Sequence, residues 1–138
     1  MKDRMIEPSL LEAPYPLQSL IGFELVGWDE GYARWELRLR KDHMNRYGIP
    51  HGGVYATLLD VAMGYAGSYT GDIDTKKLAM TLSMTTNFIG QPKGDLLIAE
   101  GHRIGGGRKT FFSEGRVCDA GGRIVANGTG TFRTRGTG

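Results

Sequence analysis

The sequence predicts an α+β domain in which one antiparallel sheet of about six strands wraps around a single long helix. Residues 52 to about 69 contain no proline and carry apolar side chains at intervals of three and four, the period of a helix with a buried face. Two strand-like runs precede this stretch and four follow it, each bounded by turn-forming residues. Because a helix and a sheet must bury their apolar faces against each other, we expect two layers around one core.

The individual strands are expected from alternating side chains and from the turns between them. Apolar and charged side chains alternate through residues 32–40, which predicts a strand with one solvated face, paired in a hairpin with residues 22–27. The runs after the helix span residues 78–89, 95–104, 108–118 and 123–133. The turns between these runs are residues 91–94, 105–107 and 119–122. The last four strands are therefore expected to follow one another through three antiparallel connections.

The length of 138 residues suits one domain, which we expect to span residues 21–135. An arm of residues 1–20 precedes it and a tail of residues 136–138 follows it. Three prolines, Pro8, Pro14 and Pro16, exclude a long helix from the arm, although a short turn over residues 17–20 fits the sequence. The arm is expected to dock on the domain.

The composition excludes several classes of protein. The net charge of +2 comes without the long Lys/Arg runs of a nucleic-acid-binding tail. No stretch reaches the roughly 18 apolar residues of a membrane span, and no export signal is visible. The single cysteine, Cys118, allows neither an internal disulfide nor a Cys-rich zinc site, and His43 and His102 are isolated. We expect a cytoplasmic protein that binds no nucleic acid, membrane or metal.

One motif points to a function. It consists of Asn45, Gly48 and His51 at intervals of three, a Gly-Gly pair at 52–53, and Asp60 nine residues after the histidine. The motif resembles the signature of PaaI-like hotdog-fold acyl-CoA thioesterases, of the phenylacetic-acid-degradation type, and the likeness extends from about residue 20 to residue 132. It implies a hotdog fold, hydrolysis of an acyl- or aryl-CoA, no cofactor beyond the CoA of the substrate, and a homodimer or a tetramer of two dimers.

The same resemblance assigns roles to the motif residues. Thioester hydrolysis needs a nucleophile and hydrogen-bond donors aimed at the carbonyl oxygen as it becomes negative. The resemblance implies that the Gly52 amide and the Asn45 side chain hold this oxygen. His51, in the same motif, is a candidate for a supporting role in catalysis. The resemblance also implies that Asp60 activates water or attacks directly to give an anhydride, and that Thr81 holds the water. The first amides of a helix, here those of residues 52 and 53, lack partners and favour negative charge.

Helix geometry adds a constraint on the site. Eight residues separate Gly52 from Asp60, about 12 Å at a rise of about 1.5 Å per residue. One reacting carbon cannot touch both residues of the same helix. Two antiparallel helices related by a two-fold axis would bring Gly52 of one chain to Asp60 of the other, so we expect two composite sites per dimer.

Basic residues near the pocket mouth are expected to bind the phosphates of CoA. The candidates are Arg103, Arg108 and Lys109, which surround the triple-glycine turn. Glycine triplets are also common in plain hairpin turns, so this expectation rests on charge alone.

Each motif residue also has a purely structural interpretation. Asp60 can be a solvated or hydrogen-bonded helix carboxylate, Asn45 can cap a turn, and Thr81 can be an ordinary strand residue. His51 can simply orient its loop.

Two other functions also remain open. The first is a noncatalytic acyl-CoA-binding sensor, which would usually need an added DNA-binding domain, although the short arm before Leu20 is too small for a helix-turn-helix. The second is a hotdog hydratase or dehydratase acting on acyl thioesters, whose Asp/His dyad is not matched by the spacing of His51 and Asp60.

Overall fold

The computed structural model describes residues 6–136, so residues 1–5 of the expected arm and 137–138 of the expected tail lie outside it. Two short 3₁₀ helices, Pro8–Leu10 and Lys41–His43, accompany two α-helices and six strands. The helices are α1 (Pro16–Ile21) and α2 (Gly52–Ala66). The strands are β1 (Glu24–Asp29), β2 (Tyr32–Arg38), β3 (Lys77–Phe88), β4 (Leu96–Gly106), β5 (Thr110–Asp119) and β6 (Ile124–Gly136).

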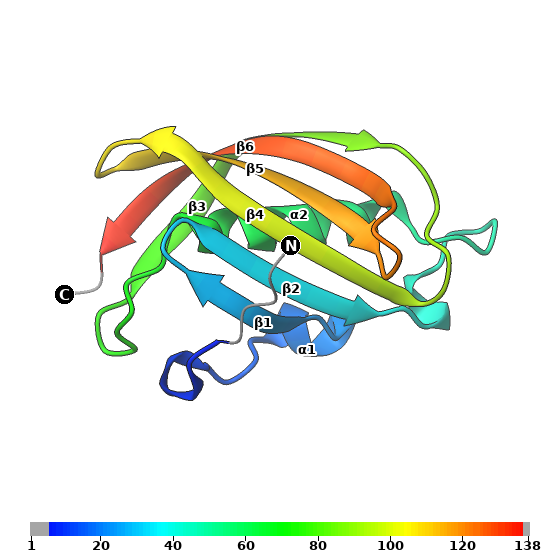
Figure 1. Cartoon of the computed structure of the whole chain (residues 1–138), viewed down its shortest axis with the longest axis horizontal. Helices are drawn as coiled ribbons and strands as arrows, with labels where there is room; N and C mark the ends of the chain where they lie inside the picture. Colours follow the sequence, from blue (N-terminus) through cyan, green and yellow to red (C-terminus); the bar gives the residue numbers. More distant parts are fainter. Residues whose placement is uncertain (1–5, 137–138) are drawn as a thin grey trace.

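The six strands form one sheet in the order β1-β2-β4-β5-β6-β3, and every neighbouring pair is antiparallel. The sheet arches over α2, which lies in its concave face (Figure 1). The predicted class, an antiparallel sheet of six strands around one long helix, is confirmed. The β1–β2 hairpin is also confirmed.

The alternation in β2 places its apolar side chains against the helix. Ala33, Trp35 and Leu37 are almost completely buried, and the intervening residues lie on the outer face. The helix itself lies directly on β4, since a Cβ on Gly101 would come within 2.2 Å of the Ala62 carbonyl oxygen. Only glycine permits this approach, and a side chain there would push the two layers apart.

The expectation that β3 and β4 are hairpin neighbours is wrong. β3 pairs along its whole length with β6 at the edge of the sheet, whereas β4 lies between β2 and β5. The turn residues 91–94 fix only where the chain changes direction. The neighbours of a strand depend on which faces must be covered, and β4, with Leu97 and Ala99 fully buried, belongs in the centre.

Several element boundaries also differ from the prediction, and two of these differences involve glycines. α2 ends at Ala66 instead of near residue 69, because the chain turns at Gly67, where a Cβ would collide with the Phe111 ring at 2.1 Å. β4 continues through the first two glycines of the triplet, and its turn to β5 closes with the Gly107 N–H donating to the Thr110 carbonyl (2.8 Å). Gly106 has a φ of 127°, which glycine adopts without strain.

The described residues contain no helix with the length and apolarity needed to cross a bilayer.

Candidate active site

Asp60 and Thr81, from different elements, are brought together as a pair. Asp60 is the ninth residue of α2 and is half-buried, and Thr81 lies on β3 beside a register shift between Thr81 and Ser83. The Thr81 hydroxyl donates a hydrogen bond to Asp60 Oδ1 at 2.5 Å. Hydroxyl bonds to carboxylates are short and strong because the acceptor is charged. The bond fixes one carboxylate oxygen and leaves Oδ2 without a hydrogen bond to any described residue.

This pair lies at a cavity of about 280 Å³ between α2 and the first part of β3. Tyr65 of α2, Trp28 of β1 and Phe132 of β6 contribute aromatic walls. Leu10 and Tyr15 reach the same cavity from the N-terminal arm. The site therefore combines a carboxylate with a mainly apolar space, the usual composition of a small-molecule pocket.

Burial and nearby negative charges both raise the pKa values of the two tyrosines in the cavity. Burial raises the pKa of Tyr15, and the negative charge of Asp60 raises it further. Burial raises the pKa of Tyr65 strongly, with added contributions from Glu12 and Tyr15. Both hydroxyls stay neutral at physiological pH and can serve as hydrogen-bond donors. Since Tyr15 and Asp60 both line the cavity, the arm contributes to the same space as the carboxylate.

The loop before α2 is a closed turn built around Asn45. Asn45 Oδ1 accepts hydrogen bonds from the backbone N–H groups of Tyr47 (2.8 Å) and Ile49 (3.4 Å). Gly48, with a φ of 77°, completes the turn. The turn-capping interpretation of Asn45 is thus realised through its oxygen. The side-chain amide nitrogen has no partner among the described residues and remains available as a donor.

His51 caps the start of α2. Its Nδ1 accepts a hydrogen bond from the Gly53 N–H at 2.8 Å, which is the role of an N-cap side chain. One of the two amides expected to be open, that of Gly53, is therefore already occupied. Within residues 6–136, no acceptor pairs with the Gly52 N–H, so this amide can receive a ligand oxygen. His51 thus fixes the start of the helix.

Gly52 and Asp60 are the first and ninth residues of α2, about 12 Å apart along its axis. Within one chain, the donor and the carboxylate are therefore too far apart to reach one reacting carbon. Phe88 lies beside Gly52, where an added Cβ would come within 3.1 Å of its ring. Glycine keeps this amide accessible next to an aromatic side chain.

The three basic candidates have different surroundings. The Arg103 guanidinium donates to the carbonyls of Gly105 (3.3 Å) and Gly107 (3.1 Å) and lies 5.7 Å from the centre of the Phe111 ring. These contacts hold the β4–β5 hairpin. Arg108 and Lys109 are exposed at the start of β5, where nothing in the described chain pairs with their charges.

Two further arginines, which the sequence did not single out, join this basic group. Thr134 of β6 donates its backbone N–H to the Lys109 carbonyl (2.7 Å), which brings the ends of β5 and β6 together. Arg133 and Arg135 flank Thr134, and with Met80 these residues line a surface hollow of about 440 Å³ beside β3. The sequence signal that could have found them is their spacing, because Arg133 and Arg135 are two residues apart and so share one face of a strand.

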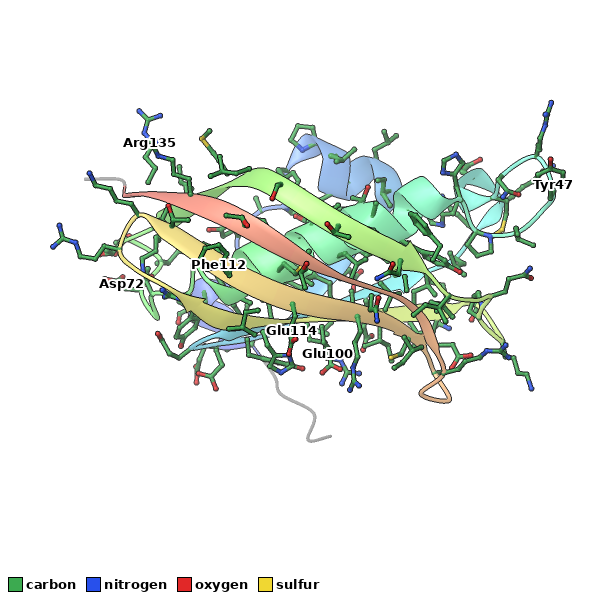
Figure 2. All side chains as sticks on the ribbon, turned by 90° about the horizontal axis from the view of Figure 1, so that it is seen from above. Tyr47, Asp72, Glu100, Phe112, Glu114 and Arg135 are labelled. Carbon is green, nitrogen blue, oxygen red and sulfur yellow. The ribbon has the colours of Figure 1, made fainter. Side chains whose placement is uncertain are left out.

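Tyr47 marks the tip of the Asn45 loop at one end of the molecule, and Arg135 lies at the opposite end (Figure 2). The free donors and the basic group of one chain are thus far apart. The part of the chain that the structure describes gathers no three acidic, histidine or cysteine side chains that could hold a metal ion.

The curved sheet around α2 is a hotdog fold, as the motif implied. Residues 47–126, more than half of the chain, match the family model of the thioesterase superfamily. The chain belongs to this superfamily.

Individual relatives agree with this placement. A Pseudomonas aeruginosa protein named "Putative esterase" is 31% identical over 97 residues, which cover 70% of this chain and 70% of the relative. The solved structure of a conserved protein from Pseudomonas aeruginosa is 28% identical, with a TM-score of 0.78 over 92% of this chain and 97% of that chain. The PaaI protein from the phenylacetic acid degradation operon of E. coli has the same fold, with a TM-score of 0.74, 20% identity, and coverage of 86% and 83%.

Proposed function

We propose that this protein is a cytoplasmic acyl-CoA or aryl-CoA thioesterase, which hydrolyses the thioester to a free acid and CoA with water as acceptor. The observation that carries the proposal is the Asp60 carboxylate, held by Thr81 at one end of an apolar cavity. Membership in the thioesterase superfamily supports a hydrolase.

The residues suggest how the reaction proceeds. As a general base, ionised Asp60 takes a proton from water while the water oxygen attacks the carbonyl carbon. As a nucleophile, it attacks the carbon itself, and water then hydrolyses the resulting anhydride. Either path breaks the carbon–sulfur bond and releases CoA as its thiol after proton uptake. The Gly52 N–H and the Asn45 side-chain amide would stabilise the negative oxygen.

The site is completed by a second subunit in this proposal. Gly52 and Asp60 are too far apart to act on one carbon within a chain. β3 is the last strand of the sheet and has one unpaired edge. Five large apolar side chains on and next to this strand are between 48% and 59% exposed: Leu78, Met80, Leu82, Phe88 and Ile89. Antiparallel pairing of two such edges about a two-fold axis would join the sheets and set the α2 helices antiparallel.

The same arrangement would supply a binding site for the phosphates of CoA. Pairing about a two-fold axis places the loop end of one subunit near the basic end of the other, because the two ends are opposite in one chain (Figure 2). Arg108, Lys109, Arg133 and Arg135 would then lie near the mouth of the partner-completed site, where their charge suits the phosphates of CoA. Arg103 has a structural role in this proposal, because its guanidinium is already bonded within the β4–β5 hairpin.

Release of free thiol from a panel of acyl- and aryl-CoA esters tests the chemistry. Asp60→Asn should lower kcat/KM by about 10²-fold or more, because the amide can neither accept the proton nor attack. Glu114→Gln is the matched control, since Glu114 is an exposed carboxylate on the outer face of the sheet (Figure 2), and it should keep wild-type rates. Binding of CoA esters without thiol release by the wild type would refute the proposal.

Subunit mixing tests the composite site. Asn45→Asp keeps the oxygen that caps the turn but removes the amide donor, and Asp60→Asn removes the carboxylate. Each variant alone should be almost inactive. Co-refolded in equal amounts, they should regain about a quarter of wild-type activity, because half the dimers are mixed and each mixed dimer carries one intact site. If both residues act from the same chain, mixing recovers nothing.

A further inference from the structure

The cavity at Asp60 extends away from the carboxylate along α2. Four residues of one helix face line it, Asp60, Val61, Gly64 and Tyr65, and Ser68 lies just beyond the end of the helix. The five residues from Asp60 to Tyr65 correspond to about 7.5 Å along the helix axis. An ester whose carbonyl carbon lies at Asp60 can therefore place its acyl group in this space.

The N-terminal arm forms one side of this cavity. Leu10 is only 4% exposed, and Tyr15 is half-buried. Glu12 forms an ion pair with Lys76 across the cavity rim (3.2 Å), and the Tyr15 ring packs edge-on against Phe23 with centroids 6.1 Å apart. The arm is thus fastened at several points to the domain.

Aromatic side chains form another wall of the cavity, and residues between 70 and 79 complete its lining. Trp28 packs against Tyr65 with ring centroids 5.1 Å apart, and its indole N–H donates to the Tyr65 carbonyl at 2.8 Å. Phe132 contributes a further ring. The volume of about 280 Å³ is at the lower limit of small-molecule sites, which span roughly 300 to 1,000 Å³. Flat rings pack well against such walls, in offset or edge-to-face contacts.

We propose that Leu10 and Tyr15 determine the acyl preference by closing this cavity, so that the enzyme accepts compact acyl groups, a single aromatic ring or a short chain, and rejects long straight chains. The proposal rests on the thioesterase function. Both residues lie outside the motif that carries the chemistry. A longer chain would have to displace these side chains and open the Glu12–Lys76 pair. A single methylene that does not fit an apolar pocket changes kcat/KM by about 10- to 200-fold.

The test compares benzoyl-, hexanoyl- and decanoyl-CoA by thiol release. Wild-type kcat/KM for decanoyl-CoA should be at least about tenfold below the values for the other two esters. Tyr15→Ala and Leu10→Ala should each raise the decanoyl-to-hexanoyl ratio about tenfold or more. Tyr15→Phe should keep the wild-type ratio, because the ring fills the space. Leu11→Ala is the matched control, since Leu11 is 53% exposed and does not line the cavity.

The outcomes separate this inference from the proposed function. If Tyr15→Ala and Leu10→Ala remain folded by circular dichroism and keep the wild-type ratio while Asp60→Asn is inactive, the arm has no role in preference and the thioesterase stands. If wild type releases no thiol from any ester, the function is wrong. Calorimetric Kd values for hexanoyl- and decanoyl-CoA, measured on Asp60→Asn with and without Tyr15→Ala, then test the arm alone: a shift in their ratio supports its role, and an unchanged ratio overturns it.

Discussion

Asp60 and Asp119 are two shielded carboxylates with opposite surroundings. Asp119 is 2% exposed, and it accepts backbone N–H bonds from Lys93, Gly121 and Arg123 at 2.9 to 3.0 Å. Asp60 accepts one hydrogen bond, from the Thr81 hydroxyl, and faces a cavity. A carboxylate whose oxygens are occupied by the backbone fixes structure. One with a spare oxygen beside an open space can react.

The hydrogen bonds of Asp119 join three segments. The turn between β5 and β6 supplies two donors, and the connection between β3 and β4 supplies the third. The bond from the Lys93 N–H, followed by that from Arg123, lowers the pKa of Asp119 despite its burial. The charged form is therefore the one that holds these segments together.

The largest contrast is expected from replacing each carboxylate by an amide. Asp60→Asn should cost about 10²-fold or more in kcat/KM and leave the melting temperature close to wild type. Asp119→Asn should lower the melting temperature, because the new NH₂ group meets a backbone N–H that needs an acceptor, and it should leave kcat/KM of the folded protein near wild type. Thiol-release assays and thermal melts on both variants measure this. A parallel loss of activity in Asp119→Asn at temperatures where it is folded would contradict the separation.

A second test sharpens the contrast through pH. The folded-state pKa of Asp119 lies below its ordinary value of 3.8, so its contribution to stability is fully present above that value. The contribution is lost as the pH falls below 3.8 towards the folded-state pKa. Urea titrations should therefore show a constant gap between wild type and Asp119→Asn above about pH 5, closing in more acidic buffer. A gap that stays constant down to pH 2 would show that the charge of Asp119 contributes nothing.

A smaller effect is expected at Thr81. Thr81→Val removes the hydroxyl that orients Asp60 and keeps the branched shape. A hydrogen bond to a charged group is worth about 1.5 to 3 kcal/mol, so kcat/KM should fall roughly 10- to 100-fold. Thr81→Ser retains the hydroxyl and should stay within a fewfold of wild type. Equal rates for the valine variant and wild type would mean that Asp60 needs no orienting partner.

The sequence predicted those parts of the fold that depend on local periodicity. The three- and four-residue spacing located α2, and alternation located β2. The position of β3 at the far edge was missed because strand order depends on which non-local partner covers each face. The same reason hides Asp119, which looks like a turn residue until Lys93 is brought to it from another segment.

The candidate site likewise has residues that the sequence pattern identified and residues that only the structure brings together. Asp60, Thr81 and the Asn45 loop stood in a recognisable pattern, and the structure brings the first two into contact. Arg133 and Arg135 join Lys109 only through the pairing of β5 with β6. The contribution of Leu10 and Tyr15 depends on how the arm, with its two short helices, packs on the domain, which no spacing rule describes.

The open edge of β3 has a consequence for how the protein is produced. A newly synthesised chain that has folded alone presents a strand of 12 residues with one row of unbonded N–H and C=O groups and several exposed apolar side chains. Such an edge can capture any extended segment, including those of unfolded neighbours, so aggregation would compete with formation of the proposed dimer. Resistance to heat should therefore rise with protein concentration, and dilute chains should be the ones most in need of chaperones.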